Sequence, residues 1–189
     1  MVSKKQKAKI ALKREQIRSQ MWPELDKNAL WDRQSSDGWL SIPRAMPMVL
    51  RVVDLLAPKG KPVSSTYLEL WCRTYDDSFV IVSNPREMAF FSGFSGERAE
   101  TTWRTRMHIL NDLGFIDIKG STLTPIHYVL LYNPYLVIKK HHEEKNLNDD
   151  YYNTLLHRLI EVGTKDLQNV VNDEKNVIDI NALMNMEVK

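Results

Sequence analysis

Six polar side chains in the segment 96–113 have the types and the spacing of a contact surface. At 100° per residue, one face of a helix over this segment carries Glu97, Thr101, Arg104, Thr105 and His108, with Arg98 at its edge. Guanidinium groups donate hydrogen bonds to phosphates and guanine edges, and threonine offers a hydroxyl and a methyl group. This row therefore has the chemistry of a nucleic-acid contact.

The opposite face of the same segment is apolar and predicts a buried side. Ala99, Trp103, Met107 and Leu110 follow one another at helical spacing. Arg106 falls on this side, so we interpret it as a structural ion pair and not as a contact residue. The segment is thus expected to be an amphipathic helix that ends at Gly114.

A second, shorter helix is predicted immediately before it. Asn84 is a strong N-cap, Pro85 suits the first helical position, and Glu87 completes a capping box. Gly93 supplies a left-handed residue that ends the helix. Ser95 is expected to cap the longer helix, whose N-terminus could then bind a phosphate. Met88, Ala89 and Phe91 are the expected buried positions.

Small, turn-forming and apolar residues stand in order at the corner between the two helices: Ala89, Gly93 and Phe94. A β-branched run, 79–83, precedes the pair, and a hairpin follows, with strands at 115–119 and 128–132. Over about 63–134 the chain resembles the winged helix-turn-helix superfamily, and its layout is most similar to the replication initiators of plasmids and other mobile elements.

The resemblance implies a fold and a binding mode. The fold is mainly α with a small β-hairpin, an α+β class, extended by a basic N-terminal arm and a C-terminal helix. The exposed face of the second helix would enter the major groove of DNA. Lys119, at the tip of the wing, would reach the DNA backbone or minor groove.

Flanking elements follow from helical periodicity and capping residues. A helix is expected over 41–56, kinked or restarted at Pro47. Another is expected over 65–75, capped by a Thr66–Glu69 box or by Ser64 or Ser65, with Cys72 buried and inert. A third runs from Asp149 or Asp150 to Val162, with an apolar face at 152–160. Beyond it, Leu167 to Val171 is weakly amphipathic, and 178–186 is a short helix or disordered.

Charge is distributed unevenly along the chain. Residues 1–20 have a net charge of +6, residues 21–140 of +1 and residues 141–189 of −5. The first of these segments, which includes Lys4, Lys5, Lys7 and Lys9, is either a frayed helix or a disordered arm. It either neutralises DNA phosphates or is a solvated tail. From Ser95 to Ser121 four basic and four acidic residues cancel.

Composition suggests three regions: a basic, Trp-containing arm over 1–35, a winged-helix domain over 36–140 and an acidic helical extension over 141–189. Trp22, Trp31 and Trp39 are expected to pack on the core or on a second subunit. The sequence 143–150 has the composition of a solvated linker.

Several classes of protein are not expected. Apolar runs are too short to span a bilayer, and no apolar segment follows the basic N-terminus as in a signal peptide. One cysteine allows no internal disulfide and suits the cytoplasm. His141 and His142 lack a second cluster that would complete a metal site. Without a nucleophile set or phosphate loop, we expect no enzyme, cofactor or small-molecule substrate.

These observations favour a cytoplasmic protein that binds double-stranded DNA and controls replication, partition or transcription of a mobile element. Helix-turn-helix proteins commonly bind two half-sites as dimers, so we expect a homodimer that uses the Trp-rich segment or the apolar face of 151–160. The alternative is a winged-helix adaptor that binds protein and does not read DNA, which the balanced charge of 95–121 would suit.

Overall fold

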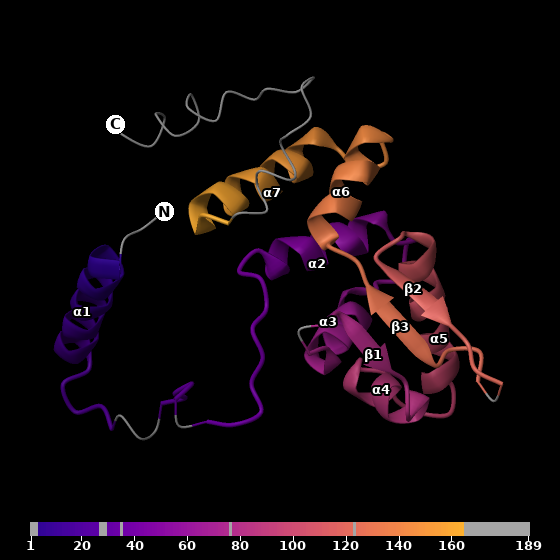
Figure 1. Ribbon diagram of the computed structural model, residues 1–189, viewed down its shortest axis with the longest axis horizontal. Coiled ribbons are helices and arrows are strands. Elements are labelled where there is room, and N and C mark those ends of the chain that lie inside the picture. The colour runs from indigo at the N-terminus through magenta and orange to yellow at the C-terminus, as the bar shows by residue number, and fades with distance from the viewer. Residues whose placement is uncertain (1–3, 27–29, 35, 76, 123, 165–189) are drawn as a thin grey trace. The chain divides into compact units, whose positions relative to one another are not determined.

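The computed structural model describes residues 4–26, 30–34, 36–75, 77–122 and 124–164 (Figure 1). The chain divides into two compact units, Met1–Ser41 and Ile42–Lys189. This division differs from the one that composition suggested. The first unit extends to Ser41 and not to residue 35, and no boundary falls near residue 140.

The first unit contains helix α1 (Lys4–Met21). Lys, Arg, Gln and Ala have high helix propensity, which accounts for a helix here. Its described side chains are exposed apart from that of Arg18, so the helix has no buried face of its own. Trp22, Trp31 and Trp39 are also exposed, and the Arg33 guanidinium lies 3.7 Å from the centre of the Trp39 ring.

The second unit combines helices with one small sheet, so the described chain is an α+β protein. The sheet is antiparallel in the order β1-β3-β2, and the helices pack against one another and against one face of it (Figure 1). Along the chain the elements are α2 (Met46–Leu56), α3 (Ser64–Arg73), β1 (Phe79–Ile81), α4 (Pro85–Phe91), α5 (Ala99–Asp112), β2 (Ile116–Lys119), β3 (Tyr128–Leu131), α6 (Pro134–Glu143) and α7 (Asp149–Val162).

Helix α2 begins later than the sequence predicts, at Met46 and not at Ser41. Pro47 therefore occupies the first turn, where its missing N–H has no intrahelical partner to lose. The expected kink or restart at Pro47 is wrong for this reason.

The predicted capping box of α3 is also wrong. The N-cap position is Val63, and the Thr66 side chain is buried in the core. The cap comes from α2 instead, because Oδ1 of Asp54 accepts hydrogen bonds from the amides of Val63 and Ser64 at 2.7 and 2.8 Å. A carboxylate from a neighbouring helix thus satisfies the free N–H groups that a local side chain was expected to satisfy.

Helix α6 directly follows the hairpin, where the sequence predicts no helix, and it ends at the first residue of the stretch 143–150. Asn133 caps it by accepting a hydrogen bond from the Tyr135 amide at 3.0 Å, and Pro134 stands in the first turn. Tyr135 and Ile138 are buried, which fixes α6 on the core. The interpretation of 143–150 as a linker holds only for the turn between α6 and α7.

Helix α7 has the predicted extent and ends at Gly163, whose φ is +63°. Its apolar side chains Tyr152, Leu155, Leu156 and Leu159 are buried, and the helix contacts α2 and α6. This face belongs to the core of the second unit. The expectation that it offers a dimer surface is therefore wrong. The predicted segments 167–171 and 178–186 lie outside the described residues.

The thiol of Cys72 is exposed, contrary to the predicted buried position. Partial burial of the thiol and the nearby Glu69 carboxylate raise the pKa of Cys72, which keeps it protonated. In the described part of the chain no helix is long and apolar enough to cross a membrane.

Candidate nucleic-acid interface

Helices α4 and α5 meet at a tight turn, as the sequence predicts. Oδ1 of Asn84 accepts a hydrogen bond from the Glu87 amide at 3.2 Å, and Pro85 opens α4. Gly93 has a φ of +88° and donates to the carbonyl of Phe90, while Phe94 donates to the carbonyl of Ala89, both at 2.9 Å. This pair of bonds is the Schellman ending, which requires a left-handed residue and so favours glycine.

The predicted packing at this corner is confirmed except at one position. Ala89 and Met88 are completely buried, and α4 and α5 are in extensive contact. Phe91 is 61% exposed, so its predicted burial is wrong. The preceding Phe90 is 67% exposed, and the two rings meet edge to face. Helix α4 thus carries two adjacent exposed aromatic rings.

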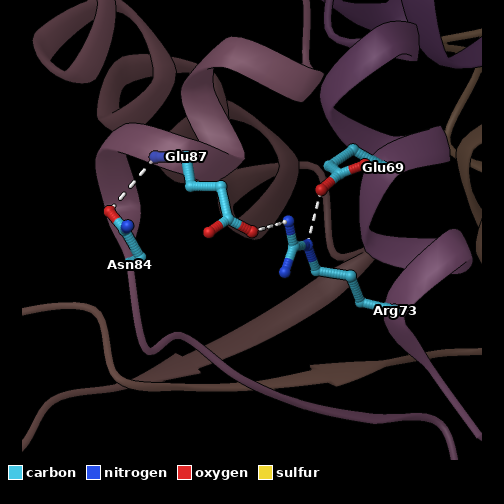
Figure 2. A network of polar contacts seen from close by, with 4 residues as sticks. All are labelled: Glu69, Arg73, Asn84 and Glu87. Carbon is cyan, nitrogen blue, oxygen red and sulfur yellow. Dashed lines mark hydrogen bonds and ion pairs between the residues drawn. The ribbon is translucent and has the colours of Figure 1, made fainter.

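An ionic clamp joins α4 to α3 (Figure 2). Arg73 of α3 contacts Glu69 through Nε, and its Nη2 lies 2.9 Å from Oε1 of Glu87. The side chain of Glu87 therefore points to α3 and does not return to the Asn84 amide, as a complete capping box would require. Burial lowers the pKa of Arg73, but the two carboxylates outweigh it and the net pKa is raised.

The N-terminus of α5 differs from the prediction. Gly96 has a φ of +80°, which is incompatible with a helical residue, and α5 begins at Ala99. Ser95 precedes the turn at 97–98, three residues before the N-cap position, and therefore does not cap α5. The N-cap residue is Arg98, whose side chain makes no capping bond either. Arg98 is exposed, and no described carboxylate forms an ion pair with it.

The two faces of α5 are as predicted. Trp103, Met107 and Leu110 are completely buried, and Ala99 is nearly so. On the other side Thr101, Thr105 and His108 are exposed and share one face. The Thr105 hydroxyl donates to the Thr101 carbonyl at 3.0 Å, so its lone pairs and methyl group remain available to a ligand. This surface is uncovered within its own unit.

Ion pairs neutralise two of the cations that the sequence predicts as contacts, Arg104 and Lys119. Nε and Nη2 of Arg104 lie 3.0 and 2.6 Å from Oε1 of Glu100, one turn earlier on α5. Nζ of Lys119 lies 3.2 Å from the Asp117 carboxylate. The Glu100–Arg104 pair could have been predicted, because side chains four residues apart in a helix are neighbours. Arg104 and Lys119, both predicted to contact DNA, therefore each form an ion pair with a carboxylate.

Arg106 makes no ion pair with any described carboxylate, which corrects its predicted role. Its guanidinium lies 5.8 Å from the centre of the Phe94 ring, in the range of a cation–π contact. Arg106 is half buried because its alkyl chain follows the core side of α5. It thus covers the corner between α4 and α5.

The two adjacent histidines of α6 hold neighbouring elements. Nε2 of His141 lies 2.8 Å from the carbonyl of Leu113 at the end of α5, and its ring stacks on Phe115. Nε2 of His142 lies 2.8 Å from Oδ1 of Asp149. Among the described residues there is no group of three or more His, Cys, Asp or Glu that could hold a metal ion.

The predicted contacts of the arm all lie on α1. Lys4, Lys5, Lys7 and Lys9 fall in its first two turns, and the side chains of Lys5 and Lys9 are exposed. Arg18 and Glu15, near the other end of the helix, approach to 3.9 Å. The first turns of α1 therefore concentrate positive charge on a helix without a buried face.

The chain was compared with protein-family models, with curated proteins and with solved structures, and none of them matches it.

Proposed function

We propose that this chain is a cytoplasmic DNA-binding protein of a mobile element, and that the region from α3 to β3 is a winged helix-turn-helix. The observation that carries the proposal is the order of elements: a helix, a strand, two helices joined by a Schellman turn, and a hairpin that completes the sheet β1-β3-β2. This order leaves the Thr101–Thr105–His108 face of the second helix exposed.

In this proposal α5 reads DNA and α1 binds its backbone. Thr101, Thr105 and His108 contact base edges in the major groove, and Arg98 approaches the phosphates from the turn before α5. Lys119 at the end of β2 reaches the backbone from the wing. Because α5 and the wing have no net positive charge, most of the affinity comes from the lysines of α1.

The process served is replication, partition or transcription control, and the protein acts as a homodimer. Two-fold symmetric binding to paired half-sites is common in helix-turn-helix proteins. With the apolar face of α7 buried in the core, the exposed Trp22, Trp31 and Trp39 are the side chains that favour a dimer contact in the first unit.

A second function, that of a protein-binding adaptor, is favoured by a specific observation. The exposed rings of Phe90 and Phe91 lie on α4, next to α5, and would gain nothing from water or phosphates. Aromatic side chains are enriched at protein interfaces. In this alternative the α4–α5 surface binds a partner protein, and the paired charges Glu100–Arg104 and Asp117–Lys119 stay unused.

A salt titration of duplex binding separates the two functions. Fluorescence anisotropy with a labelled random duplex should show affinity that falls steeply with salt concentration. Arg98→Ala should weaken binding further, whereas Arg44→Ala should not, because Arg44 is equally exposed but precedes α2. Absence of binding to any duplex at low salt would exclude the DNA proposal and leave the adaptor.

The target site can be found by selecting bound fragments from random DNA. Substituting Thr101 or Thr105 should then change which sequences are selected, whereas substituting the arm lysines should weaken all sequences alike. If the wild type and Thr101→Ala select the same sequences, Thr101 does not contribute to sequence recognition.

A further inference from the structure

The edge of the sheet that β1 forms is open to a further strand. β3 donates a hydrogen bond to the Ser78 carbonyl and accepts one from the Val82 amide, both at 2.8 Å, which turns the backbone of every second residue toward β3. The backbone groups of Phe79 and Ile81 therefore point away from the sheet. No described residue accepts a hydrogen bond from the Ile81 amide.

The opposite edge of the sheet is closed at the corresponding position. Tyr132 donates to Phe115 at 3.0 Å, so the backbone groups of Ile116 and Ile118 point outward from β2. Oδ1 of Asn111 on α5 accepts a hydrogen bond from the Ile118 amide at 3.1 Å. A strand from another molecule can therefore pair with β1 more readily than with β2.

Apart from its short length, β1 lacks the features that usually protect an edge strand. Proteins guard such edges with charged side chains or proline, but the segment 79–83 contains neither. The side chains of Phe79 and Ile81 lie on the outer face of the sheet, opposite Leu130 and Tyr128 of β3. Ile81, Leu130 and Tyr128 are 56, 40 and 39% exposed. The open edge is thus continuous with an apolar surface.

The same edge of a second copy complements this one. In an antiparallel pair centred on Val80, Phe79 of each copy stands opposite Ile81 of the other, and both residues present backbone groups to the partner. The Ile81 amide gains the Phe79 carbonyl without breaking any hydrogen bond. The Phe79 amide, which lies 3.2 Å from Oδ1 of Asp77, exchanges that long bond for the Ile81 carbonyl. A two-fold axis therefore satisfies the outward groups of both strands.

Side chains and charges fit the same register. The facing residues Phe79 and Ile81 form an aromatic and β-branched cross-strand pair, which stabilises antiparallel sheets. Asp77 stands opposite Ser83 of the second copy, so no like charges meet within 77–83. A register shifted by one residue would place the outward groups opposite residues whose own backbone faces β3. The centre at Val80 is therefore the favoured one.

We propose that two copies of this chain pair antiparallel along β1 and form one continuous sheet across a two-fold axis. The pairing rests on the proposed function, because it names a contact through which the homodimer forms in addition to the exposed tryptophans of the first unit. Since β1 has three residues, the contact is small and association should depend on concentration. The same axis relates the two α5 helices, so the DNA sites that they read should be inverted repeats.

Sedimentation equilibrium of the full chain measures the strength of this contact. Ile81→Pro removes the outward N–H but no hydrogen bond to β3, which is the position where an edge strand tolerates proline. The dimer Kd should rise at least about tenfold, because each Ile81 amide loses its acceptor. Leu130→Lys is the control, since it places a charge on the same outer face but on the central strand, and it should leave the Kd nearly unchanged.

Hydrogen exchange of the wild type, followed by NMR, makes the test independent of how the variants fold. The Ile81 amide should exchange at least about tenfold more slowly when the chain is mostly dimeric than after dilution to the monomer. The Leu131 amide, bonded to Ser78 of the same chain, should be protected alike at both concentrations.

Three results would overturn the pairing. A chain that stays monomeric, with an Ile81 amide that exchanges at its unprotected rate, has no second copy at this edge. A dimer that keeps the wild-type Kd in Ile81→Pro uses another surface, and so does a dimer in which the Ile81 amide is unprotected. These measurements contain no DNA, so a β1-paired dimer that binds no duplex would contradict the proposed function and retain the pairing.

Discussion

Helices α1 and α5 both carry candidate DNA contacts, but the surroundings of their charged side chains differ. α1 has no buried face, and only Arg18 of its described basic side chains lies within 4 Å of a carboxylate. α5 buries Trp103, Met107 and Leu110 completely, and its Arg104 is paired with Glu100. α1 therefore offers positive charge on a helix without a buried face, and α5 offers side chains fixed by its buried face but without net charge.

This difference separates affinity from specificity. Phosphate neutralisation needs cations but little geometry, which suits α1. Base readout needs side chains held at fixed positions, which a buried tryptophan and a Schellman turn provide for α5. The two contributions should therefore respond to different substitutions, and the predictions below begin with the largest expected effect.

Replacing Lys4, Lys5, Lys7 and Lys9 together by Ala should reduce duplex affinity by roughly a thousandfold near 0.1 M salt. Each lost phosphate contact lowers the slope of log affinity against log salt by about 0.9, so the slope should fall by about 3.6. Anisotropy titrations at several salt concentrations measure both quantities.

A matched pair of double variants controls for general charge. Lys5→Ala/Lys9→Ala and Lys59→Ala/Lys61→Ala each remove two exposed lysines, the second pair from the loop between α2 and α3. Only the first should change the salt slope. Equal effects of the two pairs would show that α1 contributes charge but no contact.

Trp103→Ala should lower the free energy of unfolding of the second unit by about 3–5 kcal/mol, since it leaves a large cavity under α5. Trp103 is completely buried, whereas Thr101 on the opposite face is exposed. Thr101→Ala should therefore change stability by no more than about 0.5 kcal/mol. Urea denaturation followed by circular dichroism measures both, and similar losses would mean that the two faces of α5 are not distinct.

Arg73→Ala should lower the free energy of unfolding by about 1–2 kcal/mol, because Glu69 and Glu87 both lose a half-buried partner. The side chain of Arg73 is 28% exposed and that of Glu69 is 11% exposed. Arg158→Ala is the control, since Arg158 and its partner Glu161 are more exposed, at 41 and 61%. Its effect should stay below about 0.5 kcal/mol. If both variants lose the same stability, the clamp between α3 and α4 contributes nothing particular.

Glu100→Gln should tighten duplex binding about two- to threefold by releasing Arg104, in keeping with the small energy of a partly exposed ion pair. Glu97→Gln makes the same change of charge in the turn before α5, where Glu97 is exposed. Any gain in duplex affinity beyond that of Glu97→Gln is due to the released side chain of Arg104. Unchanged affinity in Glu100→Gln would exclude Arg104 from the contacts that the sequence predicts.

Local patterns predicted most of the elements correctly. The sequence Asn84-Pro85 marked the start of α4, Gly93 its end, and the apolar spacing of α5 its buried face. The same signal at Asn133-Pro134 starts α6, but there it follows a strand and precedes a polar stretch, so it was interpreted only as the end of the hairpin. The Asn-Pro capping signal was therefore missed at α6, although the same signal had marked the start of α4.

The errors share a physical cause. Asp54 caps α3 from a different helix, Glu87 turns to Arg73 and not to its own helix start, and Phe91 is exposed although it follows the core-facing Met88 and Ala89. For Asp54 and Glu87, a contact between residues distant in sequence replaced the local hydrogen bond that the sequence suggests. For Phe91, the orientation of the last turn of the seven-residue helix α4 determined that the ring is exposed.

The sequence by itself determined most of the helix and strand segments, the buried and exposed faces of α5 and the uneven charge of the chain, because these depend on residues within a few positions of one another. Only the tertiary structure decided that Glu87 of α4 pairs with Arg73 of α3, which element caps α3, and that the apolar face of α7 is covered by α2 and α6. Pairing and burial depend on which elements lie next to one another in the fold, and the spacing of residues along the sequence does not specify those neighbours.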